Sequence, residues 1–211
     1  MDFRKLKKYK ITILLVVMNS AIWLAMEILG NTFDPDYMYS HGAMSAYGTL
    51  VDHEIWRFFT SMFLHFGPQH LMNNMLLLVV VGNYLERAVG SVRYLIIYLV
   101  SGMAASVTSC LYMVYRANYG VSAGASGAVF GLVGGLVVIV IVHHNTYDGI
   151  SIRGIALCAV LMVMAGLSSA AVDNAAHVGG LFAGVVLTAI IWKFTLKKKQ
   201  TSLENGDLNE G

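Results

Sequence analysis

The chain has 211 residues, of which 57% are hydrophobic and 12% are charged, and its mean hydropathy is +0.65. So much apolar surface exceeds what one soluble domain can bury, and it indicates a polytopic membrane protein. The formal net charge of +2 is too small to suggest a nucleic-acid partner, and the basic residues do not form one stripe. Cys110 and Cys158 lie in apolar runs without metal-binding or redox spacing, so we expect them to pack as buried side chains.

Six apolar segments approach the length that a membrane-spanning helix requires, which is about 20 residues. The first is preceded by the basic sequence MDFRKLKKYK, as a secretory signal would be, but bulky residues follow where a cleavage site needs small ones. We therefore expect it to be retained as a helix. The sequence predicts an all-α polytopic membrane protein with spans at residues 11–29, 68–86, 92–114, 126–142, 153–170 and 177–194.

These spans divide the chain into a basic N-terminal tail (1–10), a six-span domain (11–194) and a polar C-terminal tail (195–211). The C-terminal tail has too few apolar residues to bury, so we expect it to be disordered. With six spans, twelve of the 14 lysines and arginines fall on one side of the membrane. Basic residues collect in cytoplasmic loops, so both termini are expected in the cytoplasm. Small size and the lack of targeting segments favour the plasma membrane of a prokaryote.

The long loop at residues 30–64 lies on the opposite, external side in this arrangement. It mixes aspartates and glutamate with tyrosine, tryptophan and phenylalanine. Such a mixture is typical of a segment that lies at the membrane interface.

Strongly polar side chains inside spans are costly and usually mark function. His70 and Asn74 are four residues apart, so they lie on one face of the second span. Ser126 begins the fourth span and His177 begins the sixth. The external ends of the even-numbered spans meet on one side of the membrane, so we expect these four side chains to converge.

This set of side chains is suited to peptide-bond hydrolysis. His177 can remove the proton of the Ser126 hydroxyl during attack on a carbonyl and then deliver it to the leaving amine. The oxyanion needs fixed donors, each of which lowers the barrier by roughly 3 to 4 kcal/mol. The Asn74 amide, a ring N–H of His70 and the backbone N–H of Ser126 are the candidates. Ser126 is also at a helix start, where free N–H groups and the helix dipole favour negative charge.

Small and aromatic neighbours support this arrangement. Gly180 and Gly184 form a GxxxG motif in the sixth span, which permits close approach to the fourth span. Phe130 follows Ser126 by one helical turn, so its ring can contact the imidazole. Asp173 precedes His177 by one turn but is assigned to the preceding loop, so we expect a dyad rather than a triad. The fourth span contributes the bare surface of Gly124, Gly127, Gly131, Gly134 and Gly135.

Five motifs in a fixed order resemble the rhomboid family of intramembrane serine proteases. They extend from about residue 50 to residue 190 and are Trp56-Arg57, His65 with His70-x-x-x-Asn74, Gly82-x-x-x-Glu86-x-x-x-Gly90, Gly124-Ala125-Ser126-Gly127, and Ala176-His177-x-x-Gly180-x-x-x-Gly184.

The resemblance implies a six-helix rhomboid-like bundle with a Ser126 and His177 dyad, and an oxyanion site that includes His70 and Asn74. It also implies a first loop half-embedded in the bilayer, membrane-spanning proteins as substrates, and no cofactor. The segment 167–176 corresponds to the mobile cap of the family. Many bacterial members carry tyrosine where this chain has Phe130, and we expect this loss of a hydroxyl to have a modest effect. The resemblance leaves the oligomeric state open.

Several alternative interpretations remain at this stage. One alternative hypothesis is a catalytically inactive rhomboid-like protein that binds membrane helices. The intact serine and histidine argue against it. A small transporter would predict inverted repeats, and we find none. His70 and Asn74 also fit a purely structural role as hydrogen-bonding residues between helices. No metal site is expected, because His65 and His70 are five residues apart without a nearby acidic ligand.

Overall fold

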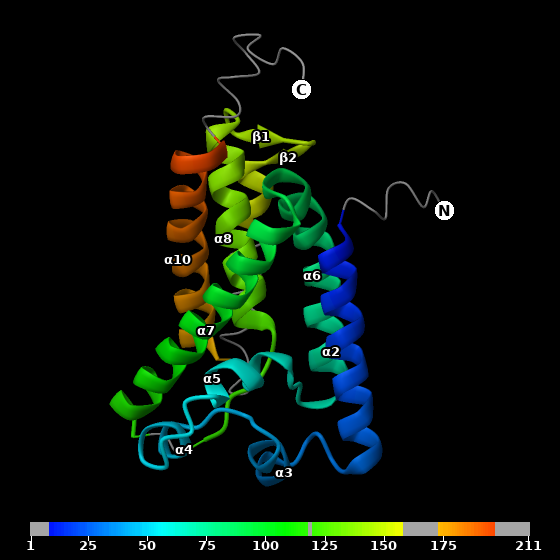
Figure 1. The fold of residues 1–211 in the computed structure, drawn as a ribbon, viewed down its shortest axis with the longest axis vertical. Coiled ribbons are helices and arrows are strands. Elements are labelled where there is room, and N and C mark those ends of the chain that lie inside the picture. The colour runs from blue at the N-terminus through cyan, green and yellow to red at the C-terminus, as the bar shows by residue number, and fades with distance from the viewer. Residues whose placement is uncertain (1–8, 118–119, 158–172, 197–211) are drawn as a thin grey trace.

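A computed structural model describes residues 9–117, 120–157 and 173–196 of the chain. Its long helices form one bundle (Figure 1) and are α2 (Lys10–Leu29), α6 (Gly67–Val89), α7 (Ser91–Tyr115), α8 (Ser126–Val142) and α10 (Asn174–Ile191). The first loop contains α3 (Pro35–Ser40), α4 (Ala46–Leu50), α5 (Arg57–Thr60) and the 3-10 helix η1 (Ser61–Phe63). A two-stranded antiparallel hairpin, β1 (Thr146–Tyr147) and β2 (Ile150–Ser151), follows α8, and the π-helical turn η2 (Trp192–Leu196) follows α10.

The prediction of an all-α membrane protein is confirmed, apart from the small hairpin. Five predicted spans coincide with α2, α6, α7, α8 and α10. In the described part of the chain, three helical stretches are long and apolar enough to cross a membrane, namely Lys10–Leu29, Ser91–Tyr115 and Asn174–Phe194. The apolar α8 is slightly shorter than this, and α6 is long enough but carries polar residues toward both ends.

The fifth predicted span, 153–170, lies mostly outside the described residues. Residues 152 to 157 are helical, and the description resumes at residue 173. Cys158 and most of the predicted cap segment 167–176 therefore fall outside it. The same holds for most of the two predicted tails.

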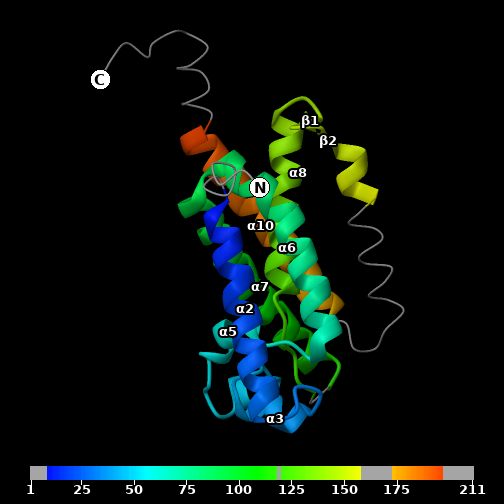
Figure 2. The same ribbon diagram turned by 90° about the vertical axis from the view of Figure 1, so that its right-hand side faces the viewer.

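The two ends of the bundle differ in structure. The start of α2, the end of α10 and the hairpin lie together at one end, while α3, α4 and α5 lie at the other (Figure 1). The view turned by 90° shows the same separation (Figure 2). Within the bundle α10 packs against α8 and α7, and α2 packs against α6. The described chain therefore begins and ends on the same side of the bundle.

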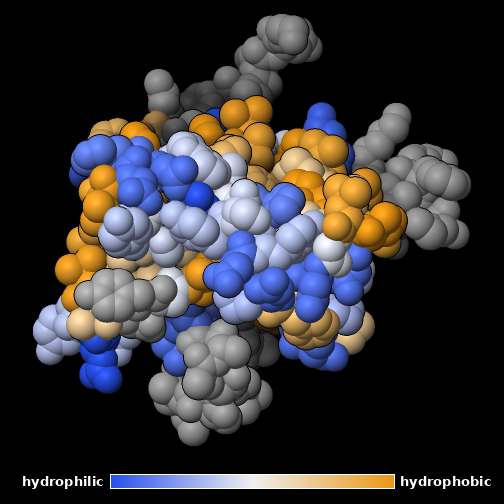
Figure 3. All heavy atoms as spheres, turned by 90° about the horizontal axis from the view of Figure 1, so that it is seen from below, coloured by the Kyte–Doolittle hydropathy of each residue, from blue (hydrophilic) through white to orange (hydrophobic). Residues whose placement is uncertain are grey.

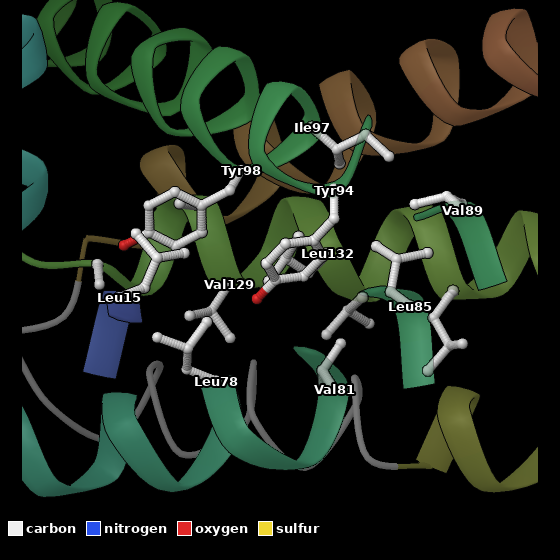
Figure 4. Close-up of a cluster of buried hydrophobic side chains, with 14 of the residues drawn as sticks. Leu15, Leu78, Val81, Leu85, Val89, Tyr94, Ile97, Tyr98, Val129 and Leu132 are labelled. Atoms are coloured by element: carbon white, nitrogen blue, oxygen red, sulfur yellow. The ribbon is translucent and has the colours of Figure 1, made fainter. Parts of the chain in front are cut away.

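The core lies between α6, α7 and α8 (Figure 4). Leu78 and Leu85 of α6 meet Tyr94 and Tyr98 of α7, and Leu132 of α8 fills the space between them. All five side chains are fully buried. A close-packed centre of this kind holds the three helices in a fixed relation, which the site at one end of α8 requires.

The outer faces of the helices are also apolar, although they are not buried. Only 22% of the apolar stretch of α2 and 28% of that of α10 is covered by protein. Helices that are apolar all round but buried on one side only are expected to face lipid with the other. From the end that carries α3 to α5, hydrophilic residues cover much of the middle while hydrophobic residues gather along parts of the rim (Figure 3).

Two buried charged residues hold the ends of this bundle together. Glu86 is 1% exposed, and its carboxylate accepts hydrogen bonds from the Thr12 backbone N–H at 2.8 Å and the Ser91 hydroxyl at 2.6 Å. It thereby joins the starts of α2 and α7 to the end of α6. At the opposite end the Arg57 guanidinium donates to the backbone carbonyl of Ala43 at 2.9 Å and lies over the Tyr39 ring. Arg57 therefore stabilises the first loop.

Candidate active site

Ser126 and His177 lie side by side although 51 residues separate them in sequence. The Ser126 hydroxyl is 2.9 Å from Nε2 of His177, which is a hydrogen-bond distance. Ser126 is the first residue of α8, and His177 lies in the first turn of α10. The imidazole is 7% exposed, and Ser126 is half-buried.

Glycine residues explain why two helices approach closely enough for this contact. A Cβ atom built on Gly180 would overlap the backbone carbonyl oxygen of Gly127, and one built on Gly184 would overlap that of Gly131. Backbone atoms cannot move aside as a flexible side chain can. The close approach of α8 and α10 predicted from the sequence is therefore present, and it depends on the absence of side chains at these positions.

Phe130 lies one turn after Ser126 and stacks on the imidazole of His177. The ring centroids are 4.1 Å apart and the planes differ by 10°. A flat contact of this kind restricts rotation of the imidazole about its side-chain bonds. It keeps Nε2 directed toward the serine hydroxyl.

No carboxylate orients His177 within the described part of the chain. Nδ1 of His177 is buried there without a hydrogen-bond partner. Asp173 is near in sequence, but its carboxylate accepts from the backbone N–H of Ala176 at 3.0 Å and from the hydroxyls of Ser109 and Ser122. The described geometry pairs Ser126 with His177 and does not place the Asp173 carboxylate on Nδ1 of His177.

His70 lies on the other side of Ser126, across Gly124. Its Nδ1 accepts a hydrogen bond from the backbone N–H of Phe66 at 3.3 Å, so Nε2 is assigned the proton. A Cβ atom at Gly124 would lie 2.9 Å from Nε2 of His70 and 3.8 Å from the Ser126 hydroxyl. The Cβ position of Gly124 therefore lies against the His70 ring, and only glycine lets this ring N–H donor lie so near the Ser126 loop.

Asn74 is placed differently from the other three polar residues. Its side chain is 3% exposed, and the amide Nδ2 donates to the backbone carbonyl of His70 at 2.9 Å within its own helix. This bond uses one of the two amide hydrogens. The amide fixes the start of α6, where His70 lies.

His65 supports the backbone next to the serine, a contact that the sequence does not reveal. Its Nε2 accepts a hydrogen bond from the backbone N–H of Ala125 at 3.3 Å, and its ring meets that of His70 edge to face. The ring is 1% exposed, and burial lowers the pKa of His65 from 6.5 to about 3. A neutral imidazole is required here, because only an unprotonated Nε2 can accept from a backbone N–H.

The first loop also holds the loop before Ser126. Met44 and Ser122 exchange two backbone hydrogen bonds of 2.9 and 2.8 Å, and the backbone N–H of Gly124 donates to the Ser61 carbonyl at 2.9 Å. Irregular backbone at membrane depth is stable only when its polar groups are paired within the protein. These contacts provide such pairing.

No three histidine, cysteine, aspartate or glutamate side chains converge in a metal-binding arrangement among the residues that the structure describes. The His65 and His70 rings are close, but no acidic ligand joins them there.

Comparison with known proteins gives the class to which this fold and site correspond. The model of the Rhomboid domain matches residues 52–194, which is more than half of the chain. The chain is 36% identical over 168 residues to RHOMBOID-like protein 7 of Arabidopsis thaliana, covering 77% of this chain and 52% of that protein.

Two bacterial relatives are named as proteases. Rhomboid protease GluP of Bacillus subtilis (strain 168) is 31% identical over 180 residues, covering 85% of this chain and 34% of that protein. Rhomboid protease AarA of Providencia stuartii is 30% identical over 202 residues, covering 84% of this chain and 71% of that protein. The chain spans about half or less of the first relatives' lengths, and most of AarA. This chain belongs to the rhomboid family of membrane proteases.

Proposed function

We propose that this protein is an intramembrane serine endopeptidase in which Ser126 is the nucleophile and His177 is the general base. The observation that carries this proposal is the 2.9 Å contact between the Ser126 hydroxyl and Nε2 of His177. The two residues lie at the starts of α8 and α10, which pack closely along a glycine seam formed by Gly127, Gly131, Gly180 and Gly184. This setting is suited to a reaction that needs fixed geometry. Relatives named as rhomboid proteases add support.

The reaction follows from this geometry. As the serine oxygen attacks the carbonyl carbon of the scissile bond, its proton passes to Nε2 of His177, and a tetrahedral oxyanion forms. The imidazolium then protonates the leaving amine, the C–N bond breaks, and an acyl ester remains on Ser126. A water molecule, deprotonated by the same nitrogen, attacks the ester and restores the serine.

The oxyanion is assigned to the region between Ser126 and His70, beside Gly124. Nε2–H of His70 borders this region, and the backbone N–H of Ser126 lies at the positive end of α8. The remaining hydrogen of the Asn74 amide is the third candidate donor, and Asn74 also positions the His70 backbone. Preformed donors in a site shielded from water stabilise charge without reorganisation.

The substrates that fit this site are membrane proteins, and their cleaved segments are transmembrane helices. Amides in a helix are hydrogen-bonded and shielded, so the segment must unwind locally before its carbonyl reaches Ser126. Small or helix-breaking residues are therefore expected near the cut.

The basic residues support one orientation of the protein in the membrane. The helix ends opposite Ser126 and the first loop carry the basic residues Lys10, Arg87, Arg93 and Lys193. The preference of basic residues for the cytoplasm assigns that end to the inside. Both termini are then cytoplasmic, and the site opens near the external surface.

The decisive experiment is cleavage of a single-span protein in liposomes, with labelling by a fluorophosphonate in detergent. The wild type should cut the substrate and be labelled at Ser126, whereas Ser126→Ala should do neither. His177→Ala should lose cleavage while remaining folded. Ser40→Ala, which removes an exposed hydroxyl in the first loop, is the matched control and should retain both activities.

Two outcomes would contradict the proposal. Cleavage that persists in Ser126→Ala would mean that another group is the nucleophile. A wild type that binds several membrane helices but neither cuts them nor reacts with the fluorophosphonate would favour a catalytically inactive helix-binding protein.

A further inference from the structure

Asp173 uses both of its carboxylate oxygens, but only one of them serves the helix that it begins. Oδ1 accepts from the backbone N–H of Ala176 at 3.0 Å, which is the N-cap bond of α10. Oδ2 accepts from the hydroxyl of Ser122 at 2.7 Å and from that of Ser109. One oxygen satisfies the N-cap, so the bonds of the second oxygen have a separate role.

The bonds of Oδ2 connect elements that meet around the proposed dyad. Ser109 belongs to α7 and is 1% exposed, whereas Ser122 lies in the loop before α8. Ser122 stands four residues before Ser126, and Asp173 stands four residues before His177. The carboxylate therefore joins the approach to the nucleophile with the approach to the base.

Three neighbours in the Ser126 loop bond to a different part of the chain. Ser122 pairs its backbone with Met44, the N–H of Gly124 donates to Ser61, and the N–H of Ala125 donates to His65. All of these partners lie between α2 and α6. Among these bonds, the Ser122 to Asp173 bond is the one that fixes the loop to the helix of His177.

We propose that Asp173 is a positioning residue that sets the distance between Ser126 and His177 by tying the nucleophile loop to the start of α10. This inference rests on the hydrolytic function proposed above. Proton transfer requires the two side chains to remain within about 2.6 to 3.2 Å. The glycine seam between α8 and α10 has few side chains to prevent sliding, and hydrogen bonds to an ionised carboxylate are stronger than those between neutral groups.

Two substitutions separate this role from helix capping. Asp173→Asn retains an oxygen that can accept from the N–H of Ala176, but it turns an NH₂ group toward the two serine hydroxyls. Ser122→Ala leaves the carboxylate and the cap in place and removes only the bond to the loop. Because a displacement near 1 Å can cost about 100-fold in rate, we expect kcat to fall about 10- to 100-fold in each variant. KM should not change.

Three further variants test the assignment. Ser122→Thr keeps a hydroxyl and should retain activity close to that of the wild type. Ser106→Ala is the control, since it removes a hydroxyl from the helix that also carries Ser109. The Ser106 hydroxyl lies 3.4 Å from that of Ser61, which is too far for a strong hydrogen bond. The double variant Ser122→Ala/Asp173→Asn should be no slower than Asp173→Asn alone, because both changes remove one connection.

The full-length protein is tested in detergent for the rate of fluorophosphonate labelling at Ser126, and in liposomes for kcat and KM. Labelling should slow in parallel with kcat while the melting temperature of Ser122→Ala stays near that of Ser106→Ala. Labelling at the wild-type rate in both Ser122→Ala and Asp173→Asn would overturn the inference, as would losses that multiply in the double variant. If Asp173→Asn does not fold, Ser122→Ala alone decides. A wild type that is neither labelled nor active refutes the proposed function, and this inference with it.

Discussion

Phe130 lies flat against the imidazole of His177, with ring centroids 4.1 Å apart and planes 10° from parallel. The two residues come from α8 and α10, and Ser126 lies one turn before Phe130 on the same helix. The aromatic ring therefore supports the imidazole from the helix that carries the serine. Since Nδ1 of His177 has no partner among the described residues, the proposed mechanism gives this contact the orienting role that a carboxylate has in a triad.

Replacing Phe130 should reduce catalysis through the orientation of His177. Phe130→Ala removes the stacked ring, so the imidazole can turn away from Ser126, and we expect kcat to fall about 10-fold or more. Phe130→Tyr keeps the ring and is the matched variant, with activity expected near that of the wild type. Cleavage by both variants is measured in liposomes. Equal rates for Phe130→Ala and the wild type would contradict the proposed role of the stack.

Gly124→Ala should abolish most of the activity by displacing His70 from the region assigned to the oxyanion. The added Cβ would lie 2.8 Å from Cε1 of His70, and the residue has a φ of +140°, which side chains rarely adopt. Loss of a productive oxyanion site costs about 100- to 1,000-fold in kcat. The readouts are cleavage and fluorophosphonate labelling.

Gly149→Ala is the control for backbone strain in this experiment. Gly149 also has a positive φ, of +81°, but no atom lies within 4 Å of its added Cβ. The control should lose some stability and keep its activity. If Gly124→Ala cleaves as fast as Gly149→Ala, the region beside Gly124 does not hold the oxyanion.

Gly184→Ala should destabilise the protein and separate the two helices of the site. Its Cβ would overlap the carbonyl oxygen of Gly131, and backbone cannot yield without a shift of α8 relative to α10. Overpacking of this kind costs about 1 to 3 kcal/mol in the free energy of unfolding. Gly154→Ala, whose Cβ would meet its nearest atom, Ser151 Oγ, at 3.5 Å, should leave the melting temperature almost unchanged. A similar melting temperature for both variants would mean that the seam tolerates a methyl group.

His65 should make the stability of the protein fall at mildly acidic pH. Burial lowers the pKa of His65 to about 3 from 6.5, so below pH 6.5 the unfolded chain binds a proton that the folded chain does not. The stabilisation is therefore fully present above pH 6.5, and it is lost by up to about 1.4 kcal/mol per pH unit as the pH falls toward 3.

The measurement is the melting temperature in detergent between roughly pH 7.5 and pH 5, a range that brackets the ordinary histidine pKa of about 6.5. His65→Gln offers a side-chain oxygen that can still accept from the N–H of Ala125, but it does not titrate. Its melting temperature should therefore depend less on pH than that of the wild type. An unchanged pH dependence in His65→Gln would show that another group is responsible.

The sequence was sufficient to predict the five long helices that the structure describes, and it selected four polar residues as a candidate site. Runs of apolar residues define spans because an unpaired backbone is too costly in lipid, and helical periodicity places His70 and Asn74 on one face. It did not predict the short helices α3, α4 and α5 or the hairpin after α8, because such elements depend on local turns and on packing against the bundle. The sequence assigns Asp173 to a loop, and it does not reveal the bonds to Ser122 and Ser109, because these partners lie 51 and 64 positions away.

Ser126 and His177 are already unusual in the sequence, because a hydroxyl and an imidazole in apolar helices flanked by glycine have few structural explanations. The folded chain specifies which atoms face each other. Nδ1 of His70 accepts from Phe66, the Asn74 amide turns to its own helix, and His65 supports Ala125. The physical reason is that a hydrogen bond requires placement to within a few tenths of an ångström. Residue spacing specifies a helix face, whereas the loop path and the packing of α8 against α10 set distances on that scale.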